Sequence, residues 1–166
     1  SMFSFAWVDI KNNSIQLCRD RIGEKPLYYF KNNEDFWFSS EIKGITLTGQ
    51  TSREINKNKI NDYFSNGKIN GKYTFFKDIY EVEPGQIINL NTVNKKISKK
   101  NYWRLDKKYK NKINNISDAF PYVKKLLSEN TEKIRINGDD KVKIGLLTSA
   151  GVDSNAILSI LFEKKL

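Results

Sequence analysis

Histidine is absent from all 166 residues of this chain, and only one cysteine, Cys18, is present. The absence of histidine excludes Ser-His-Asp and Cys-His catalysis within the chain, together with zinc sites that depend on histidine ligands. A single cysteine excludes an intrachain disulfide, and we interpret Cys18 as a structural thiol because it falls inside a predicted strand. No apolar run is long enough to span a membrane and no signal peptide is evident, so we expect a cytoplasmic protein without a membrane partner.

The composition is that of a chain able to fold, with 39% hydrophobic and 13% aromatic residues. The formal net charge is +10, and strongly basic proteins often bind nucleic acid. The cations here are mostly lysines scattered along the chain, a pattern typical of a solvated surface. We therefore expect no nucleic-acid partner, and we keep a nucleic-acid-binding module only as an alternative motivated by charge.

The first part of the chain is patterned as short strands separated by turn residues. Tight turns join four of these strands into a predicted antiparallel meander, at residues 3–9, 14–19, 26–30 and 35–39. Short helices are expected at residues 41–47 and 56–64, the second ending at Gly67. Residues 74–84 have no regular pattern, whereas residues 85–90 and 96–103 predict a closing hairpin.

A lysine- and asparagine-rich stretch without periodicity separates this part from the rest. We interpret residues 107–116 as a linker between a domain at residues 1–106 and a domain at residues 117–166. A helix follows, with Ser117 as its expected cap and Pro121 in its first turn. Its expected buried stripe consists of Phe120, Val123, Leu127, Thr131 and Ile134.

The end of the chain predicts a strand, a loop of small residues and a helix. The apolar run at residues 142–147 is typical of a buried parallel strand, and apolar residues recur at helical spacing from Ala156 onward. Between them, the unpaired N–H groups and dipole of a helix N-terminus favour an anion, to which Ser149 and Ser154 can donate. Asp153 can hold a hydrated magnesium ion. From pattern alone, an ordinary strand–turn–helix explains this stretch equally well.

The loop Ser149-Ala-Gly-Val-Asp-Ser154 resembles the Ser-Gly-Gly-x-Asp-Ser pyrophosphate loop of the N-type ATP pyrophosphatases. Ala150 replaces the first glycine, which costs on the order of 1 kcal/mol if φ is positive there. Further motifs, in the order of one family, lie at residues 3–9, 19–29, 38–43, 75–79, 82–85 and 102–103. Together they resemble the glutamine-hydrolysing asparagine synthetases, from the later half of the glutaminase domain to the start of the synthetase domain.

This resemblance implies a mixed fold, α+β followed by α/β. A partial N-terminal-nucleophile-type antiparallel β unit would occupy residues 1–106. The first helix–strand–helix of a parallel α/β ATP-pyrophosphatase domain would occupy residues 117–166. The implied activity is that of an ATP-dependent ligase of asparagine biosynthesis, which converts aspartate to asparagine through β-aspartyl-AMP with ammonia from glutamine. The implied cofactors are ATP and Mg²⁺.

The resemblance matches no segment that carries the family's N-terminal cysteine nucleophile. We therefore expect no catalytic residue here and interpret the chain as a fragment that is inactive alone. Three alternatives stay open: a non-catalytic remnant, a subunit of a split protein, or a relative that amidates another carboxylate. A partial domain would expose an apolar sheet face or a free edge, so we also expect self-association or a partner chain that completes the domains.

The resemblance also assigns roles to individual residues. ATP and pyrophosphate binding falls to Thr148, Ser149, Ala150, Gly151, Val152, Asp153 and Ser154, with Asp153 as the magnesium ligand. Four further residues are candidates for contacts between the two domains: Arg19, Asp20, Arg21 and Glu41. An ion-paired turn for the first three, or a solvated helix start for the last, is an equally good explanation.

Overall fold

The computed structural model describes residues 2–105, 113, 115–136 and 145–164. The chain forms two compact units, residues 1–106 and residues 107–166. Antiparallel sheets and helices together make a mixed α+β structure, as the sequence predicts. Within the described ranges, no helix has both the length and the apolar character needed to cross a membrane.

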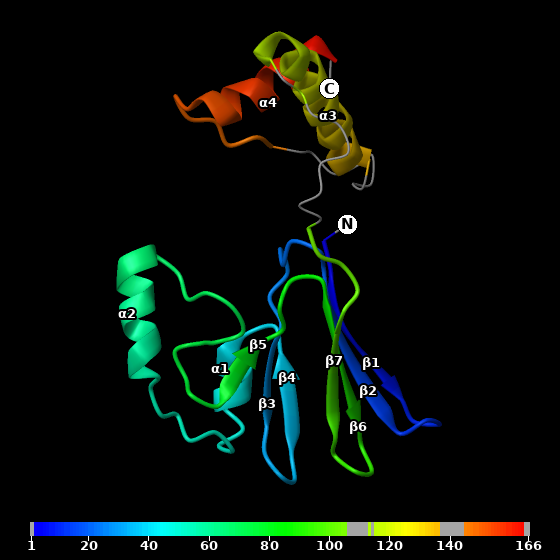
Figure 1. The fold of residues 1–166 in the computed structure, drawn as a ribbon, viewed down its shortest axis with the longest axis vertical. Helices are drawn as coiled ribbons and strands as arrows, with labels where there is room; N and C mark the ends of the chain where they lie inside the picture. Colours follow the sequence, from blue (N-terminus) through cyan, green and yellow to red (C-terminus); the bar gives the residue numbers. More distant parts are fainter. Residues whose placement is uncertain (1, 106–112, 114, 137–144, 165–166) are drawn as a thin grey trace. The chain divides into compact units, whose positions relative to one another are not determined.

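The strands of the first unit form two antiparallel sheets (Figure 1). One sheet has the order β1-β2-β6-β7, with β1 at Ser4–Asp9, β2 at Ser14–Arg19, β6 at Gln86–Asn91 and β7 at Ile97–Asn101. The other has the order β4-β3-β5, with β4 at Phe36–Ser39, β3 at Tyr28–Lys31 and β5 at Ile79–Glu81.

The strands predicted in the first unit and the β6–β7 hairpin are confirmed, but the predicted four-stranded meander is wrong. Strand β2 pairs with β6 rather than with β3, and Leu17 lies opposite Ile88 in that register. Strand β5 lies within residues 74–84, which the sequence predicts to be irregular, and there Tyr80 pairs with Tyr29. A three-residue strand is too short to show an alternating pattern, and alternation does not identify a strand's neighbour.

The two sheets pack face to face over a shared apolar core. Leu17, Leu27, Tyr29, Val82 and Ile88 are buried at its centre, with Ile15, Phe36, Tyr80 and Ile97 packed around them. The buried hydroxyl of Tyr29 is not left without a partner, because Lys99 Nζ donates to it at 2.5 Å. The four-stranded sheet thus has one face in the core, whereas its other face carries Phe5 and Trp7, which are both exposed.

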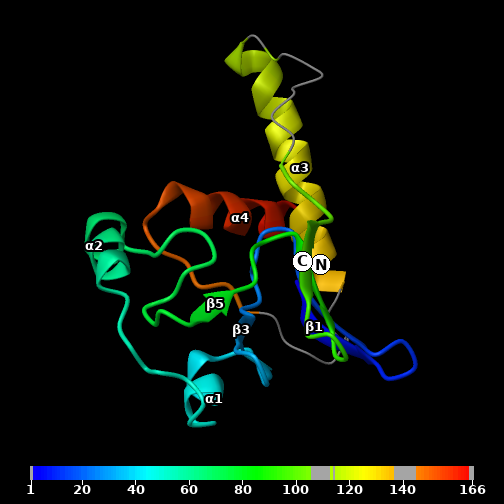
Figure 2. The same ribbon diagram turned by 60° about the horizontal axis from the view of Figure 1, so that its bottom comes forward.

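Two helices complete the first unit. Helix α1 (Ile42–Thr46) packs on the three-stranded sheet through Ile45, which is buried with Phe30 and Ile79 (Figure 2). Helix α2 (Lys57–Asn66) ends where predicted, at Gly67 with a φ of 70°, but it buries none of its residues. Glycine tolerates this left-handed conformation, which allows the chain to leave the helix.

The second unit holds helices α3 (Ile116–Ile136) and α4 (Val152–Glu163). Two details of α3 differ from the predictions. The helix begins at Ile116, so Ser117 lies inside it, and the Asn115 side chain accepts a hydrogen bond from the N–H of Asp118 at 2.8 Å. Pro121 is accordingly the sixth residue of the helix instead of part of its first turn. Asparagine is as good a cap as serine, and the sequence offers both within three residues.

The predicted buried stripe of α3 is wrong for Phe120, Val123 and Leu127, which are exposed. The side chain of Ile134 lies outside the described part. Helices α3 and α4 are joined by two ion pairs, Lys124 with Glu163 at 3.0 Å and Lys164 with Glu132 at 2.8 Å. An amphipathic pattern shows that a face can be buried, but burial also requires a packing partner.

The predicted strand at residues 142–147 is not found where the structure describes the chain. Residues 142–144 lie outside the described ranges, and residues 145–147 have no strand assignment. Leu147 is 96% exposed. A parallel strand is stabilised by neighbouring strands, and the described residues of the second unit supply none.

Candidate functional site

The predicted anion-binding loop, residues 148–154, leads into the first turn of α4. Gly151 occupies the cap position in an extended conformation, with φ −75° and ψ 151°. Ala150 is not among the residues with positive φ, so alanine pays no left-handed backbone penalty there. The backbone conformation therefore gives no reason for Ala150 to destabilise this loop.

Hydrogen bonds between the two serines hold the loop closed on itself. The Ser154 hydroxyl accepts from the N–H of Ser149 at 3.1 Å and lies 3.2 Å from the Ser149 hydroxyl. The Ser149 hydroxyl in turn accepts from the N–H of Gly151 at 3.1 Å. The structure therefore brings the two predicted hydroxyl donors side by side at the start of the helix.

Asn155 holds the loop from the other side, and the sequence analysis did not single it out. Its amide nitrogen donates to the carbonyl oxygens of Ser149 at 3.0 Å and of Gly151 at 2.9 Å. Asn155 thus fixes two carbonyl oxygens of the loop at the start of the helix. The sequence feature that could have identified Asn155 is its amide side chain directly after the Ser-x-x-x-x-Ser loop.

The backbone N–H groups at the start of α4 are the loop's main hydrogen-bond donors for a ligand. Those of Ala150, Val152 and Asp153 have no hydrogen-bond acceptor in the described part of the chain. Such N–H groups, together with the positive end of the helix dipole, attract anions. The whole loop is solvent-exposed apart from Ser154, which is half-buried.

Asp153, the predicted magnesium ligand, lies exposed in this first turn. No cluster of three or more side chains that could hold a metal ion exists in the described ranges. One carboxylate suits a magnesium ion that keeps most of its water and takes further ligands from a phosphate. The metal role of Asp153 stays a prediction.

A second cluster, around Arg19 and Asp20, lies in the first unit where the chain leaves β2 for β3. The Arg19 guanidinium is 7% exposed. It pairs with Glu81 at 2.7 Å and donates to three carbonyl oxygens, those of Gly23, Lys25 and Val82. These contacts all lie inside the first unit and tie β2 to the chain around β5.

Asp20 is 2% exposed and accepts hydrogen bonds from four consecutive backbone N–H groups, those of Ile22, Gly23, Glu24 and Lys25. Burial by itself would raise the pKa of Asp20, but these four donors outweigh it and lower the pKa to about 2. Arg19 and Asp20 therefore build a turn. Arg21 and Glu41 are exposed, and their role between domains stays a prediction.

The only cysteine is unsuited to nucleophilic chemistry. Cys18 is 6% exposed in β2, and burial raises the pKa of its thiol. A thiolate is the reactive form, so this thiol is inert at neutral pH. The prediction that Cys18 is structural agrees with this environment.

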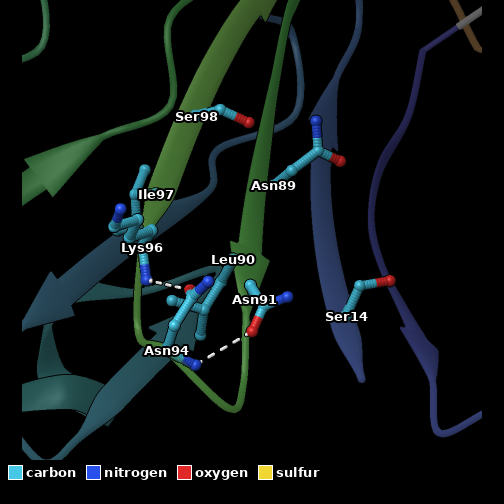
Figure 3. Close-up of a pocket in the computed structure, with 8 residues that line it drawn as sticks. All are labelled: Ser14, Asn89, Leu90, Asn91, Asn94, Lys96, Ile97 and Ser98. Carbon is cyan, nitrogen blue, oxygen red and sulfur yellow. Dashed lines mark hydrogen bonds between the residues drawn. The ribbon is translucent and has the colours of Figure 1, made fainter. Parts of the chain in front are cut away.

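A hollow at one end of the four-stranded sheet holds amides and hydroxyls but no acid (Figure 3). Ser14, Asn89, Leu90, Asn91, Asn94, Lys96, Ile97 and Ser98 line it. Two of its amide side chains stabilise the β6–β7 turn. Asn91 Oδ1 accepts from the N–H of Asn94, and Asn94 Oδ1 accepts from the N–H of Lys96, each at 3.0 Å. The hollow is thus a by-product of the hairpin.

Comparison with known proteins identifies relatives of this chain. A family model described as a glutamine amidotransferase domain matches residues 1–103. A putative asparagine synthetase [glutamine-hydrolyzing] 2 of Methanocaldococcus jannaschii is 34% identical over 98% of this chain and 31% of its own length. Asparagine synthetases [glutamine-hydrolyzing] 2 and 3 of Bacillus subtilis are 29% and 27% identical over 99% of this chain, and 23% and 26% of their own lengths. The chain thus spans less than a third of these relatives.

Proposed function

The chain belongs to the asparagine synthetase family of glutamine amidotransferases, and we propose that it serves an ATP-dependent ligase that converts aspartate to asparagine. In the proposed reaction, the aspartate side-chain carboxylate attacks the α-phosphate of ATP, which forms β-aspartyl-AMP and releases pyrophosphate. Ammonia from glutamine then attacks the acyl carbon, which releases AMP. Glutamine, aspartate and ATP are the proposed substrates, with Mg²⁺ bound to the phosphates.

Within this proposal, the two units have different roles. Residues 1–106 form a partial glutaminase-like domain, residues 107–116 a linker, and residues 117–166 the start of an ATP-binding domain. The reaction is proposed for the complete enzyme, since this chain spans less than a third of its relatives. No residue of this chain is proposed to release ammonia, because Cys18 is buried with a raised pKa.

The observation that carries the ATP assignment is the set of N–H groups at the start of α4 that have no acceptor among the residues the structure describes. Ala150, Val152 and Asp153 supply them, and the hydroxyls of Ser149 and Ser154 lie beside them. Their combined positive potential suits the β- and γ-phosphates, which become the pyrophosphate leaving group. Asp153 would hold the magnesium ion that neutralises part of this charge.

A titration of the 166-residue chain with pyrophosphate, followed by amide NMR shifts with and without Mg²⁺, tests this assignment. We expect weak binding that shifts the amides of Ala150, Val152 and Asp153. Ala150→Gly should tighten binding several-fold, because it removes the Ala150 methyl group, which restricts the approach of a phosphate oxygen. Asp153→Asn should abolish the part of the affinity that depends on magnesium.

Asp118 provides the matched control for Asp153. It is also an acidic residue in the first turn of a helix of the second unit, α3, outside the proposed site. Asp118→Asn should leave the magnesium dependence unchanged. If neither Ala150→Gly nor Asp153→Asn alters binding, the loop is a structural turn, and the non-catalytic alternative is the better description of this chain.

A further inference from the structure

Asparagine followed directly by glycine occurs three times in this chain, at residues 66–67, 70–71 and 137–138. Asparagine is a thermolabile residue, because the backbone nitrogen of the next residue can attack its side-chain amide. A glycine in the next position has no Cβ, so it lets the attacking nitrogen approach closely. The third pair lies outside the described residues, and the first two lie close together in the first unit.

The first two pairs are matched in their local sequence. Each asparagine is followed by glycine and then lysine, as Asn66-Gly-Lys68 and Asn70-Gly-Lys72. Both asparagines and both glycines are exposed to solvent. A large difference in reactivity between the two pairs must therefore come from their conformation and hydrogen bonds.

Asn66 is the last residue of α2, and the end of the helix holds both of its reacting groups apart. Its side-chain nitrogen donates to the carbonyl oxygen of Asp62 at 3.1 Å. The N–H of Gly67, which would attack, donates to the carbonyl oxygen of Tyr63 at 2.7 Å as part of the helix cap. Because each group has its own acceptor in the helix, the cap must open before the two can meet.

Asn70 and Gly71 lie between α2 and β5, and neither is held in this way. Among the described residues, the Asn70 side chain has no hydrogen-bond partner and the Gly71 N–H has no acceptor. Gly71 has a φ of +73°, and an added Cβ would meet nothing within 4 Å. The Gly71 nitrogen can therefore reach the Asn70 side chain without breaking a contact that the structure describes.

We propose that Asn70 is a site of spontaneous deamidation to aspartate and isoaspartate, from which Asn66 is protected. The Gly71 nitrogen attacks Asn70 Cγ, so that a new N–C bond forms and the bond from Cγ to the side-chain nitrogen breaks. That nitrogen leaves as ammonia and takes the proton lost by Gly71. A water molecule then opens the cyclic imide at either carbonyl carbon, and a carboxylate replaces the amide of Asn70.

The structural effect of this change is confined to the segment between α2 and β5. The carbonyl oxygen of Lys72 accepts from the N–H of Glu81 at 2.8 Å, and Tyr73 forms a bridge with Tyr80. Because these contacts hold the chain from Lys72 onward, the extra backbone atom of isoaspartate is accommodated within residues 67–71. We therefore expect the modified chain to keep its fold and to carry a lower net positive charge.

Incubation of the full chain at mildly alkaline pH, followed by tryptic peptide mapping with mass spectrometry, tests the proposal. Trypsin cleaves after lysine, so Asn66 and Asn70 fall on separate peptides, residues 60–68 and 69–72. In the folded chain, Asn70 should deamidate at least about tenfold faster than Asn66, since a nucleophile held away from its target reacts far more slowly. In urea the two rates should become similar, because the helix cap is lost.

Two variants provide the matched controls. Asn70→Gln should abolish the faster reaction and the accompanying loss of positive charge on ion-exchange chromatography, because the longer side chain closes the ring poorly. Asn66→Gln should leave both unchanged. The reaction releases ammonia without glutamate, which distinguishes it from hydrolysis of glutamine. Asn70 reacting no faster than Asn66 in the folded chain overturns the proposal, and so does a preference for Asn70 that persists in urea.

Discussion

At the scale of single residues, the most constrained positions lie where the chain leaves β2. Arg19 and Asp20 are nearly fully buried, and the polar contacts that their side chains make with described residues lie within the first unit. Removing one partner of such a cluster leaves a buried polar group unsatisfied, which costs more than the intact interaction contributes. These two residues therefore determine how β2 is joined to β3.

Asp20 gives the first unit a stability that depends on pH. Its pKa is lowered to about 2, from 3.8, so the ionised form stabilises the folded state. This contribution is fully present above the unfolded pKa and is lost as the pH falls from about 4 to about 2. A shift of this size corresponds to on the order of 2 kcal/mol. Unfolding of the parent chain and Asp20→Asn between pH 7 and pH 2 measures it.

Asp9 is the comparison for this experiment. Hydrogen bonds from Asn12 also lower its pKa, but it lies at an exposed turn. Asp9→Asn should therefore change the free energy of unfolding far less than Asp20→Asn does. An unfolding free energy of Asp20→Asn that equals that of the parent at pH 7 would show that the four N–H donors do not stabilise the fold.

Gly85 is a second tightly constrained residue, because its backbone has no room for an added Cβ atom. Its φ is +66°, and an added Cβ would lie 2.5 Å from the carbonyl oxygen of Trp103. Gly85→Ala combines the left-handed backbone penalty, about 1–2 kcal/mol, with this clash. Gly49, with φ +74° and nothing within 4 Å, isolates the backbone penalty alone. In denaturant unfolding, Gly85→Ala should be clearly more destabilising than Gly49→Ala, and equal losses would contradict the close contact.

At the scale of elements, helix ends determine what each segment can do. Helix α3 is capped by Asn115, whereas α4 begins at Gly151 without a side-chain cap. The start of α4 has no side-chain cap, whereas at the start of α3 the N–H of Asp118 is satisfied by Asn115. Two helices of one unit thus differ in their capacity for anions.

The cap of α3 can be tested by replacing each of the two candidate residues with alanine. Asn115→Ala should destabilise the helix by about 1 kcal/mol, because the N–H of Asp118 loses its acceptor. Ser117→Ala should have little effect or stabilise slightly, since alanine is the better residue inside a helix. Helical circular dichroism during thermal unfolding measures both. A larger loss for Ser117→Ala would restore serine as the cap.

At the scale of the whole molecule, the chain combines a two-sheet unit with a helical unit. Only the first is covered by the glutamine amidotransferase family model, whereas the relatives match both. The proposed chemistry correspondingly separates into glutamine use, by the family of the first unit, and ATP use, at the loop of the second. The single thiol of the chain, Cys18, is buried in the first unit.

We predict that the purified 166-residue chain releases no glutamate from glutamine. Its only thiol, Cys18, is 6% exposed and has a raised pKa, and no histidine is available to activate a hydroxyl. Glutamate formation should equal that of a buffer blank and should not change in Cys18→Ser. Release above the blank that is lost in Cys18→Ser, or on blocking the Ser1 amine, would show that the chain has its own nucleophile.

The sequence by itself determined the local elements and the family. Short runs between turn residues identified β1, β2, β3 and β4, the β6–β7 hairpin followed from its turn residues, and Gly67 ended α2 as expected. These features depend on a few neighbouring residues, whose side-chain period and backbone preferences act locally. The loop at Ser149–Ser154 was likewise recognisable because its residues are consecutive.

Only the tertiary structure decided how these elements combine. It separated β2 from β3 into different sheets, formed β5, buried Arg19 against Glu81 and left Phe120 of α3 exposed. It also selected Asn115 over Ser117 as the cap. Alternation specifies that a strand has a buried face but not its neighbour, because pairing depends on groups that are distant along the chain.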